Sequence, residues 1–400
     1  MRMSKQRKGL VPELRFSGFS EPWEVKALAP YLKQHCKKVP SSTELDVFSS
    51  TREGLKSQNE YFDGSNLAND GEYGVVPEGY FVYRHMSDDN IFKFNINKSG
   101  KQIAVSKEYP VFKTQSLDPG FLLNVLNEGR AFRAFAASQK KGGTRTRLYF
   151  KTLCTFELPL PSPKEQQKIA DCLASIDELI ALHTQKLEAL KDYKKGLMQQ
   201  FFPTEGETMP KLRFPGFREK GAWNIYPLGS VGENLDFKRV PITEKDRVKG
   251  DFPYYGASGV IDYVNDYIFD EKLLCISEDG ANLRARTYPI AFSITGKTWV
   301  NNHAHVIRFE HKSTQTLVEN YLNSVSLEDY LTGMAQPKLN RAKLDIIPIP
   351  LPSIEEQDVI ADLLNSLDEL VIHQASTVEN LAKYKSGLVQ NLFPVMDEVN

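Results

Sequence analysis

The hydrophobic residues of this chain follow their most regular pattern in two stretches, 165–198 and 356–389. Apolar side chains recur there at alternating steps of three and four residues, which is the a/d seam of a coiled coil. The second stretch repeats the first at a constant distance of 191 residues, and about half of the positions are identical. The predicted seam consists of Ile169, Leu173, Ile176, Ile180, Leu187 and Leu190 in the first helix, and of Ile360, Leu364, Leu367, Val371, Val378 and Leu381 in the second.

Polar residues interrupt both seams at matching places. His183 and Lys194 stand in the first seam where Gln374 and Lys385 stand in the second. Polar residues weaken a seam but fix its register and its partner. We therefore predict that the two helices pair with each other. The alternative is two amphipathic helices that lie on separate globular cores.

Both helices carry clear start and stop signals. Ser162 and Ser353 are predicted N-cap residues, each followed three positions later by an acidic residue, and Pro203 and Pro394 stand just beyond the last turns. Both stretches are also longer than the ~12 residues usual in globular proteins. The pattern therefore predicts two long helices with well-marked ends.

A second repeated motif, here called the opening motif, precedes each helix. Its two copies are 12–19 with Trp23 and Leu28, and 210–217 with Trp223 and Leu228. The chain is therefore two units in tandem, each with an opening motif, a domain and a long helix. The predicted boundaries are a first domain at 1–157, a central helix at 158–205, a second domain at 206–348 and a C-terminal helix at 349–400.

The interiors of the two domains are alike in style but not in sequence. Short β-rich runs alternate with clusters of Gly, Asn and Asp, and one helix is expected near the end of each domain, at 120–137 and 316–332. The expected strands are 47–50, 79–83 and 103–106 in the first domain, and 273–277, 298–300 and 305–309 in the second. We predict that both domains are α+β.

The composition, with 41% hydrophobic and 25% charged residues in 400, is that of a globular protein with more than one domain. The basic N-terminal stretch lacks the apolar run of a signal peptide, and no segment approaches the ~18 apolar residues of a membrane span. The four cysteines are scattered, which indicates neither a disulfide framework nor a zinc site. We expect a cytoplasmic protein without membrane contact, whose thiols are reduced and mostly buried.

Two basic loops with glycine precede the long helices, again 191 residues apart. The net charge of −1 does not itself indicate nucleic-acid binding, so local charge matters. Flexible glycine, amide and basic side chains suit contact with phosphate, and an ordinary solvated turn is the alternative. The DNA-contact candidates in and just after these loops are Arg145, Arg147, Gln336, Lys338, Asn340 and Arg341.

The second domain offers five further DNA-contact candidates. Tyr255 could set its ring against a sugar or base, although core packing is the usual role of such a tyrosine. Arg284 and Arg286, alternating on an expected strand, would share a face and suit phosphate or guanine, with exposed salt bridges as the alternative. Asn302 and His303 can hydrogen-bond to base edges, and turn structure is the competing explanation for Asn302.

A search for an enzyme site finds none. The Asn-Pro-Pro or Asp-Pro-Pro motif of adenine methyltransferases does not occur, and the Gly-Lys-Thr run at 296–298 has Ala291 where a P-loop requires its first glycine. His303 and His305 would face the same side of a strand, as metal ligands can, but no third ligand stands nearby in sequence. We predict no catalytic residue and no metal ligand.

The whole pattern resembles the specificity subunit of type I restriction-modification systems. The resemblance extends over essentially the full length, and two such helices with matching opening motifs make it specific. It rests on 161–170 with Asp177, on 350–361 with Asp368, on the runs at 14–16 and 212–214, and on the phrases at 299–305 and 335–340.

This resemblance implies a DNA-binding subunit without catalytic activity. Each domain would be a target recognition domain that reads one half of a bipartite, asymmetric sequence in double-stranded DNA. The two helices would pack antiparallel as a coiled coil and act as a molecular ruler. Two methyltransferase subunits, and restriction subunits with translocase activity, would assemble on the chain. No cofactor is expected on this chain; S-adenosylmethionine, ATP and Mg are expected on the partner subunits.

Two other classes of function stay open at this point. An enzyme, such as a fused methyltransferase or nuclease with an unrecognised motif, would show activity as the pure chain. A coiled-coil scaffold without a DNA role would be expected to lack the duplicated basic loops.

Overall fold

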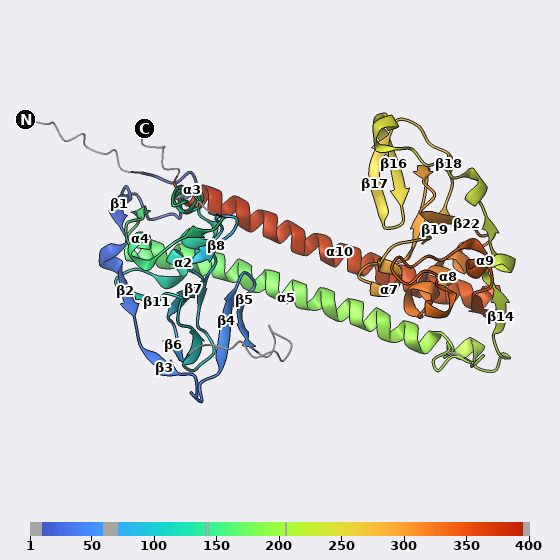
Figure 1. Cartoon of the computed structure of the whole chain (residues 1–400), viewed down its shortest axis with the longest axis horizontal. Helices are drawn as coiled ribbons and strands as arrows, with labels where there is room; N and C mark the ends of the chain where they lie inside the picture. Colours follow the sequence, from blue (N-terminus) through green and yellow to red (C-terminus); the bar gives the residue numbers. More distant parts are fainter. Residues whose placement is uncertain (1–9, 59–70, 141, 143, 205, 395–400) are drawn as a thin grey trace, which may run out of the picture. The chain divides into compact units, whose positions relative to one another are not determined.

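The structure, a computed structural model, describes residues 10–58, 71–140, 142, 144–204 and 206–394. The chain forms two compact units, each built of sheets, short helices and parts of the two long helices (Figure 1). Unit 1 comprises Met1–His183 with Thr377–Asn400, and unit 2 comprises Thr184–Ser376. The basic N-terminal stretch and Gly143 of the first basic loop lie outside the described residues. The predicted domain boundaries stay predictions.

The two long helices agree with the sequence pattern. Helix α5 spans Pro163–Phe201 and α10 spans Ile354–Leu392, so each contains 39 residues. Each begins directly after its predicted serine cap, whose carbonyl accepts the N–H of the residue four positions on, at 3.0 Å for Ser162 and 2.9 Å for Ser353. The prediction of two long helices is confirmed, and both continue slightly beyond the predicted ends.

Unit 1 contains two main sheets and two short strand pairs. The strand orders are β3-β6-β10-β4-β5 and β2-β11-β7-β9, with the pairs β1-β13 and β12-β8. The strands are β1 Glu24–Ala27, β2 Leu32–His35, β3 Lys38–Pro40, β4 Val47–Thr51, β5 Gly54–Ser57, β6 Glu72–Val76, β7 Phe81–Tyr83, β8 Met86–Ser87, β9 Phe94–Ile96, β10 Ile103–Ser106, β11 Val111–Thr114, β12 Thr146–Arg147 and β13 Glu157–Leu160. Besides the parts of the two long helices, the described residues of unit 1 form η1 Ala29–Tyr31, α2 Pro119–Glu128, α3 Arg130–Ser138 and α4 Phe150–Leu153.

Unit 2 contains two four-stranded sheets of different order from those of unit 1. The orders are β15-β22-β19-β20 and β17-β16-β21-β18, with the pair β14-β23. The strands are β14 Asn224–Pro227, β15 Glu233–Asn234, β16 Lys249–Gly256, β17 Gly259–Val264, β18 Phe269–Asp270, β19 Leu273–Ser277, β20 Ala291–Ile294, β21 Lys297–Val300, β22 Ala304–Arg308 and β23 Pro348–Leu351. The shorter helices are η2 Pro215–Phe217, α6 Leu228–Val231, η3 Asp236–Lys238, η4 Glu244–Asp246, α7 Asn282–Ala285, α8 Lys312–Ser324, η5 Glu328–Tyr330 and α9 Arg341–Asp345.

The α+β class is confirmed, and so is a strand at each of the six predicted runs. The two domain helices differ from expectation. The helix expected at 120–137 is interrupted, because Gly129 has an extended conformation (φ −66°, ψ 128°) between α2 and α3. In unit 2, α8 stops at Ser324, since Val325 is extended (φ −103°, ψ 156°). The spacing of apolar residues alone does not predict either of these two helix ends.

The opening motifs fold in the same way in both units. Strand β1 pairs antiparallel with β13, and β14 pairs antiparallel with β23. Leu160 and Leu351, 191 residues apart, hold the same place in these pairs. Trp23 and Trp223 stand just before the first strands and are buried in the main core of their own unit. The repeat in sequence is therefore a repeat in structure.

A buried ion pair joins each opening motif to the start of a long helix. The Arg15 guanidinium donates to both carboxylate oxygens of Glu165 (2.8 and 2.9 Å), and Arg213 donates to both of Glu356 (2.7 and 2.7 Å). The Arg213 and Glu356 side chains are only 7% and 1% exposed. Hydrogen bonds to the carboxylates raise the pKa of both arginines, so both remain charged. Each pair is bidentate, the strongest geometry available to these groups.

The glutamine that follows each glutamate ties the long helix to a helix of the domain. The side-chain oxygen of Gln166 accepts the main-chain N–H of Asp118, the N-cap of α2, at 3.0 Å. The side-chain oxygen of Gln357 accepts the hydroxyl of Thr314, in α8, at 2.6 Å. The Glu-Gln step at each helix start therefore organises the domain around it.

Within each unit, the start of one long helix shares a core with the end of the other. In unit 1, Leu173 of α5 lies in the same buried cluster as Leu392 of α10. In unit 2, Phe201 of α5 lies in the same cluster as Leu364 of α10. Among the twelve predicted seam residues, those buried are Ile169, Leu173, Ile176, Leu187, Ile360, Leu364 and Leu367, and those half-buried are Ile180, Leu190, Val371, Val378 and Leu381.

Two lysines of the predicted seam form ion pairs with the other long helix. In unit 1, Lys385 of α10 contacts Asp177 of α5 at 2.7 Å, and it also pairs with Glu128. In unit 2, Lys194 of α5 pairs with Asp368 of α10. Burial lowers the pKa of Lys385, but its hydrogen bonds to Asp177 and Glu128 outweigh burial and leave the pKa raised. The two contacts are equivalent under the 191-residue repeat.

Among the described helices, none is long and apolar enough to cross a membrane. The four cysteines are free thiols: Cys275 is buried, Cys154 and Cys172 are half-buried, and Cys36 is exposed. Burial raises the pKa of the Cys275 and Cys154 thiols, which disfavours their thiolate forms.

Replacing Arg213 by alanine should lower the free energy of unfolding by about 3–5 kcal/mol, because it leaves the Glu356 carboxylate buried without a partner. Denaturant unfolding of the purified chain measures this loss. Lys191→Ala is the matched control, since its pair with Glu188 is exposed and contributes little. The double change Arg213→Met with Glu356→Met should be milder than Arg213→Ala. Equal stability of Arg213→Ala and the wild-type chain would refute a structural role for the pair.

Candidate nucleic-acid interface

Arg147 lies on a short strand rather than in an irregular turn. In β12, Thr146 and Arg147 pair antiparallel with Ser87 and Met86 of β8. The Thr146 side chain is buried, whereas Arg147 is exposed. Among the described residues, the Arg147 side chain has no hydrogen-bond or ion-pair partner. It is therefore a free cation held on a defined backbone.

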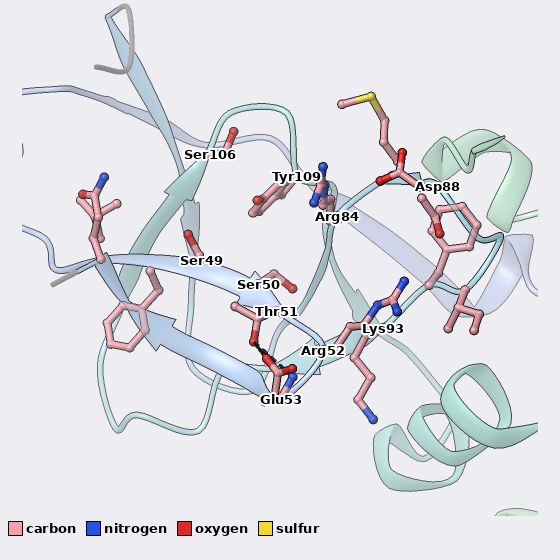
Figure 2. Close-up of a pocket in the computed structure, with 17 residues that line it drawn as sticks. Ser49, Ser50, Thr51, Arg52, Glu53, Arg84, Asp88, Lys93, Ser106 and Tyr109 are labelled. Carbon is pink, nitrogen blue, oxygen red and sulfur yellow. Dashed lines mark hydrogen bonds between the residues drawn. The ribbon is translucent and has the colours of Figure 1, made fainter. Parts of the chain in front are cut away.

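Strand β8 also forms one wall of a cleft of about 560 Å³ in unit 1. Figure 2 shows the labelled cations Arg52, Arg84 and Lys93 around this cleft, together with labelled hydroxyl side chains of β4 and of the segment around Ser106 and Tyr109. The lining residues with hydroxyl groups are Ser49, Ser50, Thr51, Ser87, Ser106 and Tyr109. Cations and hydroxyls are the side chains that contact DNA phosphates. The cleft is thus continuous with the strand that positions Arg147.

The cations of this region fall into two classes. Arg145 donates to Asp88 at 2.8 Å, and Arg52 contacts Asp89 at 2.6 Å. The hydrogen bonds from Arg52 lower the pKa of Asp89 to about 2. Exposed pairs of this kind are weak in water. By contrast, neither of two lining residues, Arg84 and Lys93, pairs with any residue that the structure describes. No carboxylate among the described residues therefore neutralises these two cations.

Sequence reasoning missed Arg84 and Lys93. Each stands outside the repeated segments, beside a different strand, and only the sheet brings them to one cleft. The neighbouring Tyr149 was missed too: its exposed ring stacks on His85, with centroids 5.4 Å apart. No spacing rule in the sequence connects these positions.

In unit 2 the second basic loop is closed and rigidly connected. The main chains of Thr332 and Lys338 exchange two hydrogen bonds of 2.8 Å, which close a loop over Gly333–Pro337. Gln336 is exposed, and the Lys338 amine lies 3.1 Å from Glu278 with half of its side chain exposed. Arg341 pairs loosely with Asp345 at 3.5 Å. These candidates therefore share one surface at the start of α9.

Asn340 has a structural role that the sequence analysis did not assign. Its side-chain oxygen accepts the N–H of Lys343 at 3.1 Å and so caps α9. Such a cap satisfies an otherwise free N–H at the helix start.

The predicted strand carrying Arg284 and Arg286 is wrong, because these residues belong to α7 and its end. Arg286 has a left-handed backbone (φ 51°) and donates to the carbonyls of Leu322 and Val325 at 2.9 and 3.0 Å. It therefore fastens the end of α8, and burial lowers its pKa. Arg284 binds Glu328 at 2.9 Å and donates to the Met334 carbonyl at 2.9 Å. An alternation of two residues was too short to distinguish a strand from a helical turn.

The remaining candidates divide between core and turn. Tyr255 is half-buried on β16 and stacks on Phe292 at 6.0 Å, which is the packing alternative. Asn302 and His303 are exposed in a turn, where His303 contacts Asp279 at 2.8 Å. His303 precedes β22 while His305 is buried within it, so the expectation that both face one side of a strand is wrong.

One group of side chains has the composition of a metal site. Asp236, Glu278 and His305 bring their ligand atoms within 4.8 Å of one another. However, Arg239 already contacts both carboxylates, at 3.3 and 2.7 Å. Both nitrogens of His305 are also in hydrogen-bonding contacts, with Asp236 and with the Leu339 carbonyl. These residues therefore fit an internal ion-pair cluster better than a zinc site, whose ligands must be free to face the metal.

Known proteins resemble this chain in sequence and in fold. A family model described as the type I restriction modification DNA specificity domain matches residues 95–192 and 220–380. A type I restriction enzyme specificity subunit of Haemophilus influenzae is 35% identical over 144 residues, which cover 36% of this chain and 37% of that protein. The MjaVIII specificity subunit of Methanocaldococcus jannaschii is 27% identical over 65% of this chain and 66% of its own length. The chain thus spans only part of either relative.

The fold also has a solved counterpart. The crystal structure of the S subunit of a type I restriction-modification system from M. genitalium aligns with a TM-score of 0.63 and 13% identity. The alignment covers 97% of this chain and all of that one. At this identity the likeness concerns the fold.

Replacing Arg84, Lys93 and Arg147 together by alanine should weaken DNA binding about equally for all sequences. The slope of log affinity against log salt should flatten by about 0.9 for each phosphate that the variant no longer neutralises. Titration of the assembled complex at several salt concentrations measures both effects. The control replaces three exposed lysines of unit 1 outside the cleft, Lys33, Lys37 and Lys98. An unchanged slope in the first variant would show that the cleft does not face phosphate.

Proposed function

Because the chain belongs to the type I restriction modification DNA specificity family, whose members recognise DNA and perform no catalysis themselves, we propose that its two units read two different halves of one asymmetric DNA target. The observation that carries this proposal is the contrast between repeated borders and unlike interiors. The opening motifs, strand pairs and ion pairs are equivalent, while the strand orders between them differ. Two half-sites of different sequence require this combination.

The DNA-contacting surface of unit 1 is proposed to be the cleft with Arg84 and Lys93, continued by Arg147. That of unit 2 is proposed to be the closed loop with Gln336 and Lys338. Cations position the duplex through phosphate, whereas base edges carry the sequence information. Each surface combines cations with amide or hydroxyl groups that can contact bases.

The long helices are proposed to pair as an antiparallel coiled coil and so to set the distance between the half-sites. The reciprocal pairs Lys385–Asp177 and Lys194–Asp368, each within one unit, support this pairing. A seam lysine that pairs with a carboxylate of the other helix favours one register over its neighbours. A fixed register gives a fixed spacer.

Two methyltransferase subunits and restriction subunits with translocase activity are proposed to assemble on this chain in the cytoplasm. S-adenosylmethionine, ATP and Mg are proposed to be bound by those partners. The near-neutral charge of the chain supports a division of labour in which the partners add phosphate contacts.

Exchanging residues 28–140 for the equivalent segment of a related subunit should change one half of the target and leave the other intact. The exchanged segment lies between Arg15 and Glu165 in the sequence, so the chimera keeps the ion pair of these two residues. Mapping of methylated adenines by the assembled complex measures the outcome. A chimera that alters both halves together would rule out modular reading.

Inserting seven residues after Glu188, and seven after Glu379, should lengthen the spacer without changing either half-site. Glu188 and Glu379 are equivalent positions, and a heptad keeps the seam in phase. Seven residues add roughly 10 Å of helix, or at most about three base pairs. The same methylation mapping measures the spacer, and insertion of four residues at each site is the control that breaks the seam. An active heptad variant with the original spacer would disprove the ruler role.

A further inference from the structure

The exposed loop of unit 2 is built on a constrained root. Gly333 has a left-handed backbone (φ 82°), and a Cβ atom there would lie 2.4 Å from the Gln336 carbonyl oxygen. Only glycine fits this turn without rearrangement. The turn leaves Met334 94% exposed at the tip, next to the exposed Gln336. The glycine turn therefore constrains the backbone that leads to the exposed tip.

Main-chain hydrogen bonds attach the root to the end of β19 and the segment after it. The N–H of Leu339 donates to the Glu278 carbonyl at 2.7 Å, and the N–H of Gly280 donates to the Pro337 carbonyl at 3.1 Å. The side chain of Leu339 is fully buried. The loop thus leaves the core at Leu339.

The Leu339 carbonyl is bound by a buried histidine. His305 is 1% exposed, and its Nε2 lies 2.7 Å from that carbonyl oxygen. A carbonyl oxygen can only accept, so Nε2 is the donor. The other ring nitrogen, Nδ1, lies 2.6 Å from Asp236 Oδ2, while Asp236 Oδ1 accepts the N–H of Val306 at 2.9 Å. The carboxylate therefore fixes the plane of the ring.

Asp236 is held in its charged form. Burial raises its pKa, but the hydrogen bond and charge of His305, together with the N–H of Val306 and the charge of Arg239, outweigh burial and leave the pKa below its ordinary value. The Asp236 carboxylate contacts Nδ1 and accepts the N–H of Val306, so both ring nitrogens of His305 are in contact with fixed groups.

The same cluster holds the Lys338 side chain. Arg239 bridges Asp236 and Glu278, and the second oxygen of Glu278 lies 3.1 Å from the Lys338 amine. The main chain at Leu339 and the side chain at Lys338 are therefore tied to one set of buried charges. A shift of the loop would break several charge-assisted hydrogen bonds at once.

We propose that His305 is a positioning residue for DNA recognition by unit 2: by donating to the Leu339 carbonyl, it aims Gln336 and Lys338 at the DNA. The proposal rests on the DNA-reading role given above. His305 itself does not touch DNA, because it is buried. Fixing contact groups before binding reduces the ordering that association requires.

Two substitutions at position 305 separate this role from simple packing. Glutamine can place its amide nitrogen near the position of Nε2 and keep the donor to Leu339. Asparagine reaches only the position of Nδ1, so it keeps the contact with Asp236 and loses Leu339. In the assembled complex, His305→Asn should raise the Kd for target DNA about tenfold, as expected for one unpaired buried carbonyl. His305→Gln should stay within about twofold of the wild-type value.

The readout is binding to three DNA duplexes: the full target, the target with the half-site of unit 2 scrambled, and the target with the half-site of unit 1 scrambled. His305→Asn should lose discrimination only against the first scrambled duplex. Equal binding by both variants and the wild-type complex would overturn the proposal. A loss shared by both variants in proportion to a lowered Tm would overturn it too, because that outcome describes packing alone.

A second measurement covers poor folding of His305→Asn. Gln336→Ala with Lys338→Ala changes only exposed side chains, so it should fold normally and show the same selective loss. Full discrimination by this loop variant would overturn the proposal regardless of position 305. The wild-type complex serves as the reference for the proposed function. If the wild-type complex does not distinguish target from scrambled DNA, the DNA-reading role is wrong. If it does, and His305→Asn discriminates equally well, only the positioning role of His305 is wrong.

Discussion

The ion pair between the arginine of an opening motif and the first turn of a long helix is the contact on which each unit depends. Glu165 and Glu356 lie where free helix N–H groups favour negative charge. Burial makes each charge costly alone, and the bidentate arginine offsets that cost. The partners are 150 residues apart for Arg15 and 143 for Arg213, so each pair closes a whole domain.

Closing the domain at its borders explains how the interiors can differ. The strand pair beside each arginine and the glutamine beside each glutamate repeat in both units. The segment between the opening motif and the long helix needs only to begin and end at the equivalent positions in both units. Unit 1 fills the interval with a five-stranded and a four-stranded sheet, and unit 2 with two four-stranded sheets. One frame therefore supports two surfaces, which is the property that reading unlike half-sites demands.

Sequence reasoning succeeded where the cause of structure is local or repeated. The a/d period and the serine caps predicted α5 and α10, because helix formation depends on neighbours three and four residues away. It failed where structure depends on distant partners. From the sequence, Arg286 is expected to be a surface cation, yet in the structure it donates hydrogen bonds to the carbonyls of Leu322 and Val325. Arg84 and Lys93 meet in a cleft only through the sheet, and the tie of Leu339 to His305 crosses 34 residues.

Carboxylates control how strongly the candidate surfaces attract DNA. Asp88 holds Arg145 in an exposed pair, which phosphate can displace at low cost. Glu278 holds Lys338 from a largely buried position and shares its charge with Arg239, so this lysine is oriented as well as neutralised. Such ion pairs lower the affinity of the cations for DNA phosphate in general. DNA whose groups match the positions of the contact residues is then favoured over other DNA. A chain with a net charge of −1 is thus suited to discriminate between DNA sequences rather than to attract all DNA strongly.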